Sequence, residues 1–179
     1  MNKQMEEELV VLVDEKNYGI GIAPKETVHS AHTPLHRAFS LFIFNKHGQV
    51  LLTKRALTKK TFPGIWTNAV CGHPGPGEKT VDAAKRRLKN ELGITNVIDI
   101  KEVAPYRYRY TDANGIEENE ICPILTAVFD SIPKPNKDEI DDWKWMDWEK
   151  FLEEIHIHSD TYSSWSKEEA LILKEIFCR

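Results

Sequence analysis

The segment NAVCGHPGPGEKT, residues 68–80, places a thiol two positions before an imidazole, at the start of a loop rich in proline and glycine. Cys71 and His73 can be two ligands of a structural zinc, but the chain has no second Cys-x-x-Cys pair to complete such a site. A free cysteine is also often a small buried hydrophobic side chain. The local sequence therefore leaves a chemical role and a packing role open for Cys71.

Two further pairs of residues have spacings that suit chemistry. Glu118 and Glu120 lie two positions apart, so in a strand both point to one side, where two carboxylates are costly without a cation. Arg87 and Glu91 lie one helical turn apart and can approach one ligand, the guanidinium holding phosphate oxygens and the carboxylate a hydrated Mg²⁺. The alternative for this second pair is an ordinary salt bridge on a solvated helix face.

The elements that must position these residues belong to one soluble domain, which we expect to span residues 1–179. Its composition is 41% hydrophobic and 29% charged, as is typical of globular proteins. The longest apolar run, AFSLFIF, is too short to span a bilayer, and the N-terminus lacks the pattern of a signal peptide. Three irregularly spaced cysteines argue against a disulfide framework. These features predict a cytoplasmic protein with reduced thiols.

The net charge is only -4, and acidic and basic residues are interspersed along the chain. This distribution predicts neither a nucleic-acid surface nor a membrane patch. An anionic ligand would have to be bound by a local group of cations.

Strand patterns predict three antiparallel hairpins. The first follows the strand ELVVLVD and turns at EKNYG, where we expect Gly19 to supply the permissive backbone. The second turns at 45–48 within FSLFIFNKHGQVLLTKR. The third turns at 112–115 within YRYRYTDANGIEENEICPILTAVF.

Helical patterns follow in three places. Thr80 can cap a helix whose apolar stripe, Val81, Ala84, Leu88 and Leu92, ends at Gly93. A shorter helix is expected over WEKFLEEI, and a last one over SKEEALILKEIF, with Ser166 and Glu169 as a capping box. Hairpins mixed with a few helices predict an α/β (α+β) sandwich, in which a mixed sheet lies between helices.

From Gly72 to Ile94 the spacing of the chain matches G-x5-E-x7-R-E-U-x-E-E-x-G-U, in which U is aliphatic. This segment resembles the Nudix box, except that Arg87 and Asn90 replace two of its acidic residues. Nudix hydrolases need those carboxylates to hold divalent ions that activate water at a diphosphate. The departure disfavours hydrolysis of a nucleoside diphosphate derivative.

Four separated motifs, TNAVCGHP, HTPLHRAF, YRYRYTD and ENEICP, occur between about Lys25 and Trp165. Together they resemble the type I isopentenyl-diphosphate isomerases, enzymes with a Nudix fold. The resemblance implies a mixed sheet between helices and isopentenyl diphosphate as the substrate. It also implies a divalent ion, Mn²⁺, Zn²⁺ or Mg²⁺, at a site formed by His29, His36, His73, Glu118 and Glu120. His32 is interpreted as a bystander.

The same resemblance implies the roles of the remaining site residues. Cys71 and Glu120 would be the acid–base groups on opposite sides of the substrate, with Tyr108 beside the Glu120 carboxylate. Trp165 would lie beside the tertiary carbocation that forms between the addition of one proton and the removal of another. The diphosphate contacts would be Lys25, Arg55, Lys59 and Arg87, together with Mg²⁺ bound by Glu91 and the backbone carbonyl of Cys71. We expect a monomer or weak homodimer. A Nudix hydrolase and a non-catalytic metal-binding Nudix module are the alternatives.

Overall fold

The computed structural model describes residues 8–178 of the chain. Its elements, in order, are β1 Leu9–Val13, β2 Gly19–Pro24, α1 Lys25–Val28, β3 His36–Arg37, β4 Phe39–Phe44, β5 Gln49–Arg55, β6 Trp66–Thr67, β7 Val70–Gly72, α2 Thr80–Leu92, β8 Ile98–Ala104, β9 Arg107–Thr111, β10 Glu117–Ile121, β11 Ile124–Val128, β12 Ile140–Asp147, α3 Trp148–Ile157, a short 3-10 turn Ser159–Thr161, and α4 Ser164–Phe177.

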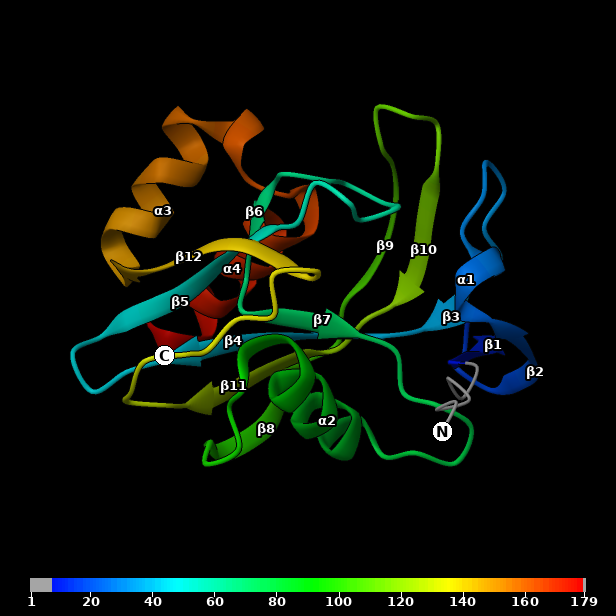
Figure 1. Cartoon of the computed structure of the whole chain (residues 1–179), viewed down its shortest axis with the longest axis horizontal. Coiled ribbons are helices and arrows are strands. Elements are labelled where there is room, and N and C mark those ends of the chain that lie inside the picture. Colours follow the sequence, from blue (N-terminus) through cyan, green and yellow to red (C-terminus); the bar gives the residue numbers. More distant parts are fainter. Residues whose placement is uncertain (1–7, 179) are drawn as a thin grey trace.

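The larger of two sheets has the strand order β12-β5-β4-β11-β8, with β7 paired to β4 and β6 to β5. Alternate residues of β4 point to opposite sides of this sheet. Leu41 and Ile43 pack with the apolar stripe of α2, and Phe42 packs with α3 and α4. Helices therefore cover both faces of a mixed sheet (Figure 1), and the predicted α/β class is confirmed.

The smaller sheet has the order β2-β1-β3-β10-β9 and carries two of the predicted hairpins, β1–β2 and β9–β10 (Figure 1). Its central strand, β3, is only two residues long and pairs parallel with β10, so that His36 lies opposite Glu120. Sequence patterns did not predict β3, because two residues show no periodicity.

Several local predictions about the ends of elements were wrong. Asn17, with φ 65°, adopts the left-handed conformation in the first turn, where Gly19 was expected to provide it. Lys79 precedes α2 as its N-cap residue, and Thr80 is the first residue of the helix.

The expected capping box of the last helix was also wrong. α4 begins two residues earlier, and Ser163 caps it by accepting a hydrogen bond from the backbone N–H of Ser166. Trp165 therefore lies in the first turn of α4 and not in a linker before it. Glu169 does not reach back to the cap, because its carboxyl group bonds Ser40 on the neighbouring sheet.

In residues 8–178, no helix combines the length and the apolar character needed to cross a membrane. Four tryptophans pack against the two cores. Trp143 and Trp145 pack on the α2 side of the larger sheet, and Trp66 and Trp148 on the side of α3 and α4.

Candidate active site

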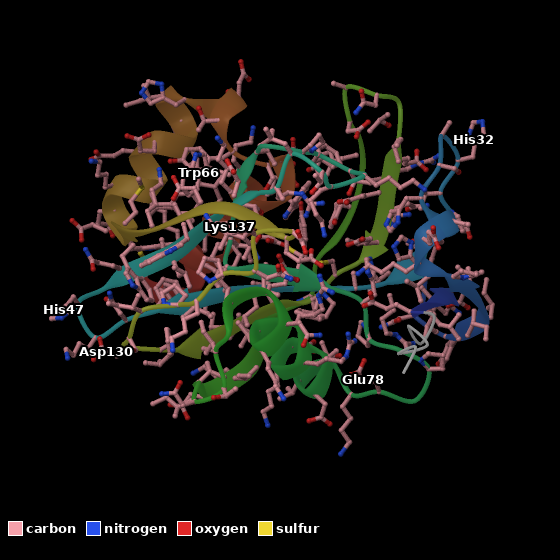
Figure 2. All side chains as sticks on the ribbon, in the orientation of Figure 1. His32, His47, Trp66, Glu78, Asp130 and Lys137 are labelled. Atoms are coloured by element: carbon pink, nitrogen blue, oxygen red, sulfur yellow. The ribbon has the colours of Figure 1, made fainter. Side chains whose placement is uncertain are left out.

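A cavity of about 930 Å³ opens beside the junction of the two sheets. It brings together every predicted site residue except His36, which lies fully buried behind its wall. The predicted site residues that line the cavity are Lys25, His29, Arg55, Lys59, Cys71, His73, Arg87, Glu91, Tyr108, Glu118, Glu120 and Trp165. His32 is exposed in the loop between α1 and β3 and points away from the protein (Figure 2).

Three imidazoles and one carboxylate meet at this cavity. The ligand atoms of His29, His36, His73 and Glu120 all lie within 4.8 Å of one another. Glu120 Oε1 is 2.9 Å from His73 Nε2 and 3.3 Å from His36 Nε2. His36 Nδ1 lies 2.9 Å from the carbonyl oxygen of Pro34, which suits an N–H donor there and leaves the Nε2 lone pair facing the cluster.

The protonation of this cluster suits a divalent ion. Burial lowers the pKa of His29 to about 3 and that of His73 to about 4, so both imidazoles are neutral at neutral pH and can donate a lone pair. His29 Nε2 and His73 Nδ1 are buried without a hydrogen-bond partner among the described residues. Three imidazole nitrogens and a carboxylate oxygen are ordinary ligands of Zn²⁺ and Mn²⁺, so the group fits divalent metal binding.

Glu118 lies outside this group of four but is linked to it by Tyr108. The Tyr108 hydroxyl donates to Glu120 Oε2 at 2.6 Å and lies 3.1 Å from Glu118 Oε2. Asn119 points to the other side of β10, where its side chain donates to the Thr33 carbonyl. The alternation expected along this strand is therefore present. Burial, reinforced by the charge of Glu120, raises the pKa of Glu118, so this carboxyl group retains its proton more readily.

Cys71 lies at the cavity wall on β7, half-buried. Its sulfur is 3.4 Å from both Ser40 Oγ and Asn68 Oδ1. Burial, and next the nearby Glu169 carboxyl, raise the pKa of the thiol to about 12, so Cys71 is protonated at neutral pH. Because the thiol lines the cavity with polar partners, its environment differs from that of a purely packing cysteine.

Aromatic rings enclose the same part of the cavity. Trp165 stacks on Tyr108, with ring centroids 5.8 Å apart and an interplanar angle of 16°. Phe62 and Trp165 pack in a T-shaped arrangement, with their ring centroids 5.0 Å apart. Cys71 packs against this apolar cluster, so the thiol and Trp165 belong to one region of the wall.

Cations from separate parts of the chain form another region of the wall. Arg87 pairs with Glu91 at 2.5 Å, so the i,i+4 salt bridge of the alternative interpretation is present, but both side chains are buried and the solvated helix face that it assumed was wrong. Lys59 pairs with Glu139, and Lys25 with Glu8. Each of these cations is held by a carboxylate.

Arg55 has a different environment from those cations. Its guanidinium group donates to the backbone carbonyls of Thr61 and Phe62 and so fixes the loop that follows β5.

Sequence reasoning missed four residues of the site. Glu8 and Glu139 occur in segments without a motif, and only the fold brings them to Lys25 and Lys59. Ser40 reads as an ordinary strand residue within an apolar run. Glu169 could have been found from the sequence, because it lies one helical turn after Trp165 and so on the same, inward side of α4. It was missed because we had assigned it to a capping box.

Comparison with known proteins defines the class first. The NUDIX domain model matches residues 34–165, more than half of the chain. The fold is shared with a crystal structure of a Deinococcus radiodurans protein, at a TM-score of 0.73 and 19% identity over 91% of this chain and 97% of the other. It is also shared with a MutT protein from Methanosarcina mazei Go1, at a TM-score of 0.65 and 18% identity over 82% and 97%.

Similar sequences define the family more narrowly. The isopentenyl-diphosphate Delta-isomerase of Saccharopolyspora erythraea is 45% identical over 94% of this chain and 87% of its own length. That of Mycolicibacterium vanbaalenii is 50% identical over 79% of this chain and 78% of its own. The chain belongs to the isopentenyl-diphosphate Delta-isomerase family of NUDIX-domain proteins, and the resemblance seen in the sequence motifs is confirmed.

A test of the cavity wall is the substitution Gly72→Ala. A Cβ atom at Gly72 would lie 2.8 Å from Arg87 Cγ and 3.1 Å from the Phe39 ring, so Arg87 must move. We expect the free energy of unfolding in urea to fall by about 1–3 kcal/mol from this overpacking. Gly75→Ala is the control, since its Cβ meets only Glu78 Oε2 at 3.6 Å. Equal stability of the two variants would contradict the close approach.

A second test concerns the Glu8 carboxylate. Burial opposes its ionisation, but Lys25, Arg87 and Arg86 together lower its pKa to about 2. Because this value lies below that of the unfolded chain, the added stability is complete above the ordinary carboxyl pKa and is lost as the pH falls toward 2. The side chain is about a third exposed, so we expect Glu8→Gln to cost about 1 kcal/mol at pH 7, after discounting for screening.

The measurement is urea unfolding of the wild type and Glu8→Gln from pH 7 to pH 2. The two curves should converge at the acidic end. Glu153→Gln, an exposed substitution on α3, removes the same charge and should match the wild type throughout. A constant difference between Glu8→Gln and wild type at all pH values would show that the ion pairs are not its source.

Proposed function

We propose that the protein interconverts isopentenyl diphosphate and dimethylallyl diphosphate by moving protons at two carbons of the substrate, with the help of a divalent ion. The observation that carries the proposal is that two kinds of proton-exchanging group, the Cys71 thiol and the hydrogen-bonded pair of Tyr108 and Glu120, line one cavity. The same cavity has a cationic wall suited to a diphosphate. The names of the similar sequences support the same activity.

The proposed metal ligands are His29, His36, His73 and Glu120, with Glu118 as a further ligand. A divalent ion bound there would offset the negative charge of the neighbouring carboxylates. The ligand set favours Zn²⁺ or Mn²⁺, and Mg²⁺ is the ion we expect with the diphosphate, bound by Glu91 and the backbone carbonyl of Cys71.

In the forward direction a proton is added at C4 of the substrate and another is removed from C2. We assign the addition to the proton held between Glu120 and Tyr108, whose oxygens lie 2.6 Å apart, and the removal to Cys71, which must first lose its thiol proton so that the thiolate can accept the one from C2. The reverse direction exchanges these roles, and the protonated resting state of Cys71 then supplies the acid. Such positioned groups each contribute roughly 10²- to 10⁴-fold to a rate.

The tertiary carbocation between the two steps must be stabilised and kept from water. Trp165 presents an indole ring at the cavity, and an indole beside a desolvated cation contributes about 2 kcal/mol. Its packing with Tyr108 and Phe62 closes that part of the wall to water.

The diphosphate is assigned to Lys25, Arg55, Lys59 and Arg87. In the structure Lys25, Lys59 and Arg87 are paired with Glu8, Glu139 and Glu91, so these side chains are already ordered and oriented. Phosphate oxygens would take over part of their hydrogen bonding, which limits the entropy lost on binding. A cytoplasmic monomer or weak homodimer remains a prediction.

The roles of Cys71 and Glu120 are tested by Cys71→Ala and Glu120→Gln. We expect each to lower turnover of isopentenyl diphosphate at least about 10³-fold, because each removes a group that exchanges a proton with the substrate. Proton NMR in deuterated water follows the reaction, and wild-type enzyme should introduce deuterium into the product methyl group.

Matched controls are Cys178→Ala, an exposed thiol, and Glu117→Gln, which lies on the other side of β10. Both should retain activity near that of the wild type. A Cys71→Ala or Glu120→Gln enzyme within a few-fold of wild type would overturn these roles. Release of inorganic phosphate or pyrophosphate, with the double bond unmoved, would favour a hydrolase. Metal binding without either reaction would favour a non-catalytic module.

Metal dependence is tested by chelation. We expect a chelator to remove both the bound ion, measured by elemental analysis, and the activity, and add-back of Mn²⁺, Zn²⁺ or Mg²⁺ to restore turnover. His36→Ala should fail to retain metal, because it deletes one of four clustered ligands. His32→Ala, which alters an exposed histidine, should retain it. Full activity of a verified metal-free preparation would refute the metal requirement.

A further inference from the structure

Glu169 is a carboxyl group with no exposed surface and no cationic partner. It lies on α4 one helical turn after Trp165 and is 0% exposed. Oε2 lies 2.7 Å from Ser40 Oγ, and Oε1 has no hydrogen-bond partner in the described part of the chain. Among residues 8–178, no lysine, arginine or histidine forms an ion pair with it. An ionised carboxylate in such surroundings would be strongly disfavoured.

Ser40 connects this carboxyl group to Cys71. The two residues are direct partners in the antiparallel pairing of β4 with β7, and Ser40 Oγ lies 3.4 Å from Cys71 Sγ. Ser40 is itself completely buried. The hydroxyl therefore has two neighbours, the carboxyl group and the thiol, and only one proton to donate.

Asn68 fixes the direction of the hydrogen bonds around Cys71. Its Nδ2 donates to the carbonyl oxygens of Leu41 and Val70, so its Oδ1 must be the atom that faces the thiol. An amide oxygen only accepts, and the Cys71 S–H therefore donates to Asn68.

Proton counting then determines the rest of the chain of bonds. Because the thiol proton is engaged with Asn68, the contact between Ser40 and the sulfur is a hydrogen bond only if Ser40 donates it. Ser40 then has no proton left for Glu169, so Glu169 must be the donor, and a carboxyl group donates only when it is protonated.

The charges around Glu169 favour the same protonated state. Burial raises the pKa of Glu169 well above its ordinary value, and the charges of Glu120 on β10 and Glu168 on α4 add to this effect. The titratable group that faces it from β7 is the Cys71 thiol, which it reaches through Ser40.

We propose that Glu169 is a positioning residue for the isomerisation: as a neutral acid it donates to Ser40, which donates to the Cys71 sulfur and fixes the direction in which the thiol faces the substrate. This inference rests on the proposed function. Stability does not explain a carboxyl group at this position, because burying a polar group that is only partly hydrogen-bonded costs free energy.

The test compares Glu169→Met, which cannot donate a hydrogen bond, with Glu169→Gln, which can. We expect Glu169→Met to lower kcat about tenfold or more with KM changed less than about twofold, because the thiol is misdirected while the diphosphate contacts remain. Glu169→Gln should retain at least about a third of the wild-type kcat. Glu175→Met, an exposed substitution on the same helix, is the matched control and should behave like the wild type.

Two further measurements separate positioning from a general effect on folding. Ser40→Ala should reproduce the loss of kcat, and Ser40→Ala with Glu169→Met should lose no more than either alone, because both break one chain of bonds. The infrared spectrum of the wild type minus that of Glu169→Gln should contain the carbonyl band of a neutral carboxyl group.

The outcomes distinguish this inference from the proposed function. A wild-type enzyme that does not isomerise isopentenyl diphosphate overturns the proposed function. An active wild type overturns the positioning role if Glu169→Met has normal kcat, if Glu169→Gln is as impaired as Glu169→Met, or if the neutral carboxyl band is absent. Should Glu169→Met fail to fold, Ser40→Ala and the infrared band still decide.

Discussion

A parallel pairing between two segments of the chain is the constraint on which the site depends. The strands β3 and β4 run beside β10 and β11, first in the smaller sheet and then in the larger one. Hydrogen bonds from Ala38 to Ile121 and from Ser40 to Pro123 carry the pairing across the junction between the sheets. One ladder therefore fixes both the contact of His36 with Glu120 and the place of Ser40 behind Cys71.

This strand pairing joins the candidate metal ligands to the apolar core, so their buried side chains extend from rigid strands. Burial alone would raise the pKa of Glu120, but its contacts with the imidazoles of His36 and His73 hold it well below its ordinary value. Within residues 8–178, Glu118 and Glu169 form no ion pair with an imidazole, and burial raises their pKa values. Carboxyl groups buried around one cavity thus have different protonation states, as expected where protons are exchanged.

The fold was predictable from the sequence wherever a pattern extends over several residues. Alternation and turn residues identified the hairpins, and the stripe of Ala84, Leu88 and Leu92 identified α2. The two residues of β3 carry no period, and their place depends on a partner strand some eighty positions away. The left-handed turn at Asn17 was missed because a nearby glycine offered the easier explanation.

The candidate site was predictable only in part, for a related reason. Separated motifs identified the residues that the cavity collects, since each motif contains several chemically unusual side chains. Glu8 and Glu139 carry no such mark, because a glutamate paired with a lysine far along the chain looks like any surface charge. Burial is a property of the folded chain, so the buried state of Arg87 with Glu91 and of Glu169 could not be read from local spacing.

The character of α2 explains why a NUDIX fold can support a reaction other than hydrolysis. Where the Nudix box has a carboxylate, this chain has Arg87, and where it has another, Asn90. The helix thus keeps the Glu91 carboxylate and has the buried Arg87 guanidinium beside it. A group of carboxylates would bind several cations, whereas this pair of opposite charges can also attract an anion. Fewer clustered carboxylates can hold fewer metal ions against the diphosphate to activate water. The groups that we propose to exchange protons lie instead on β7, β9 and β10, so the proposal divides anchoring of the phosphates and chemistry at the carbon chain between different elements of the fold.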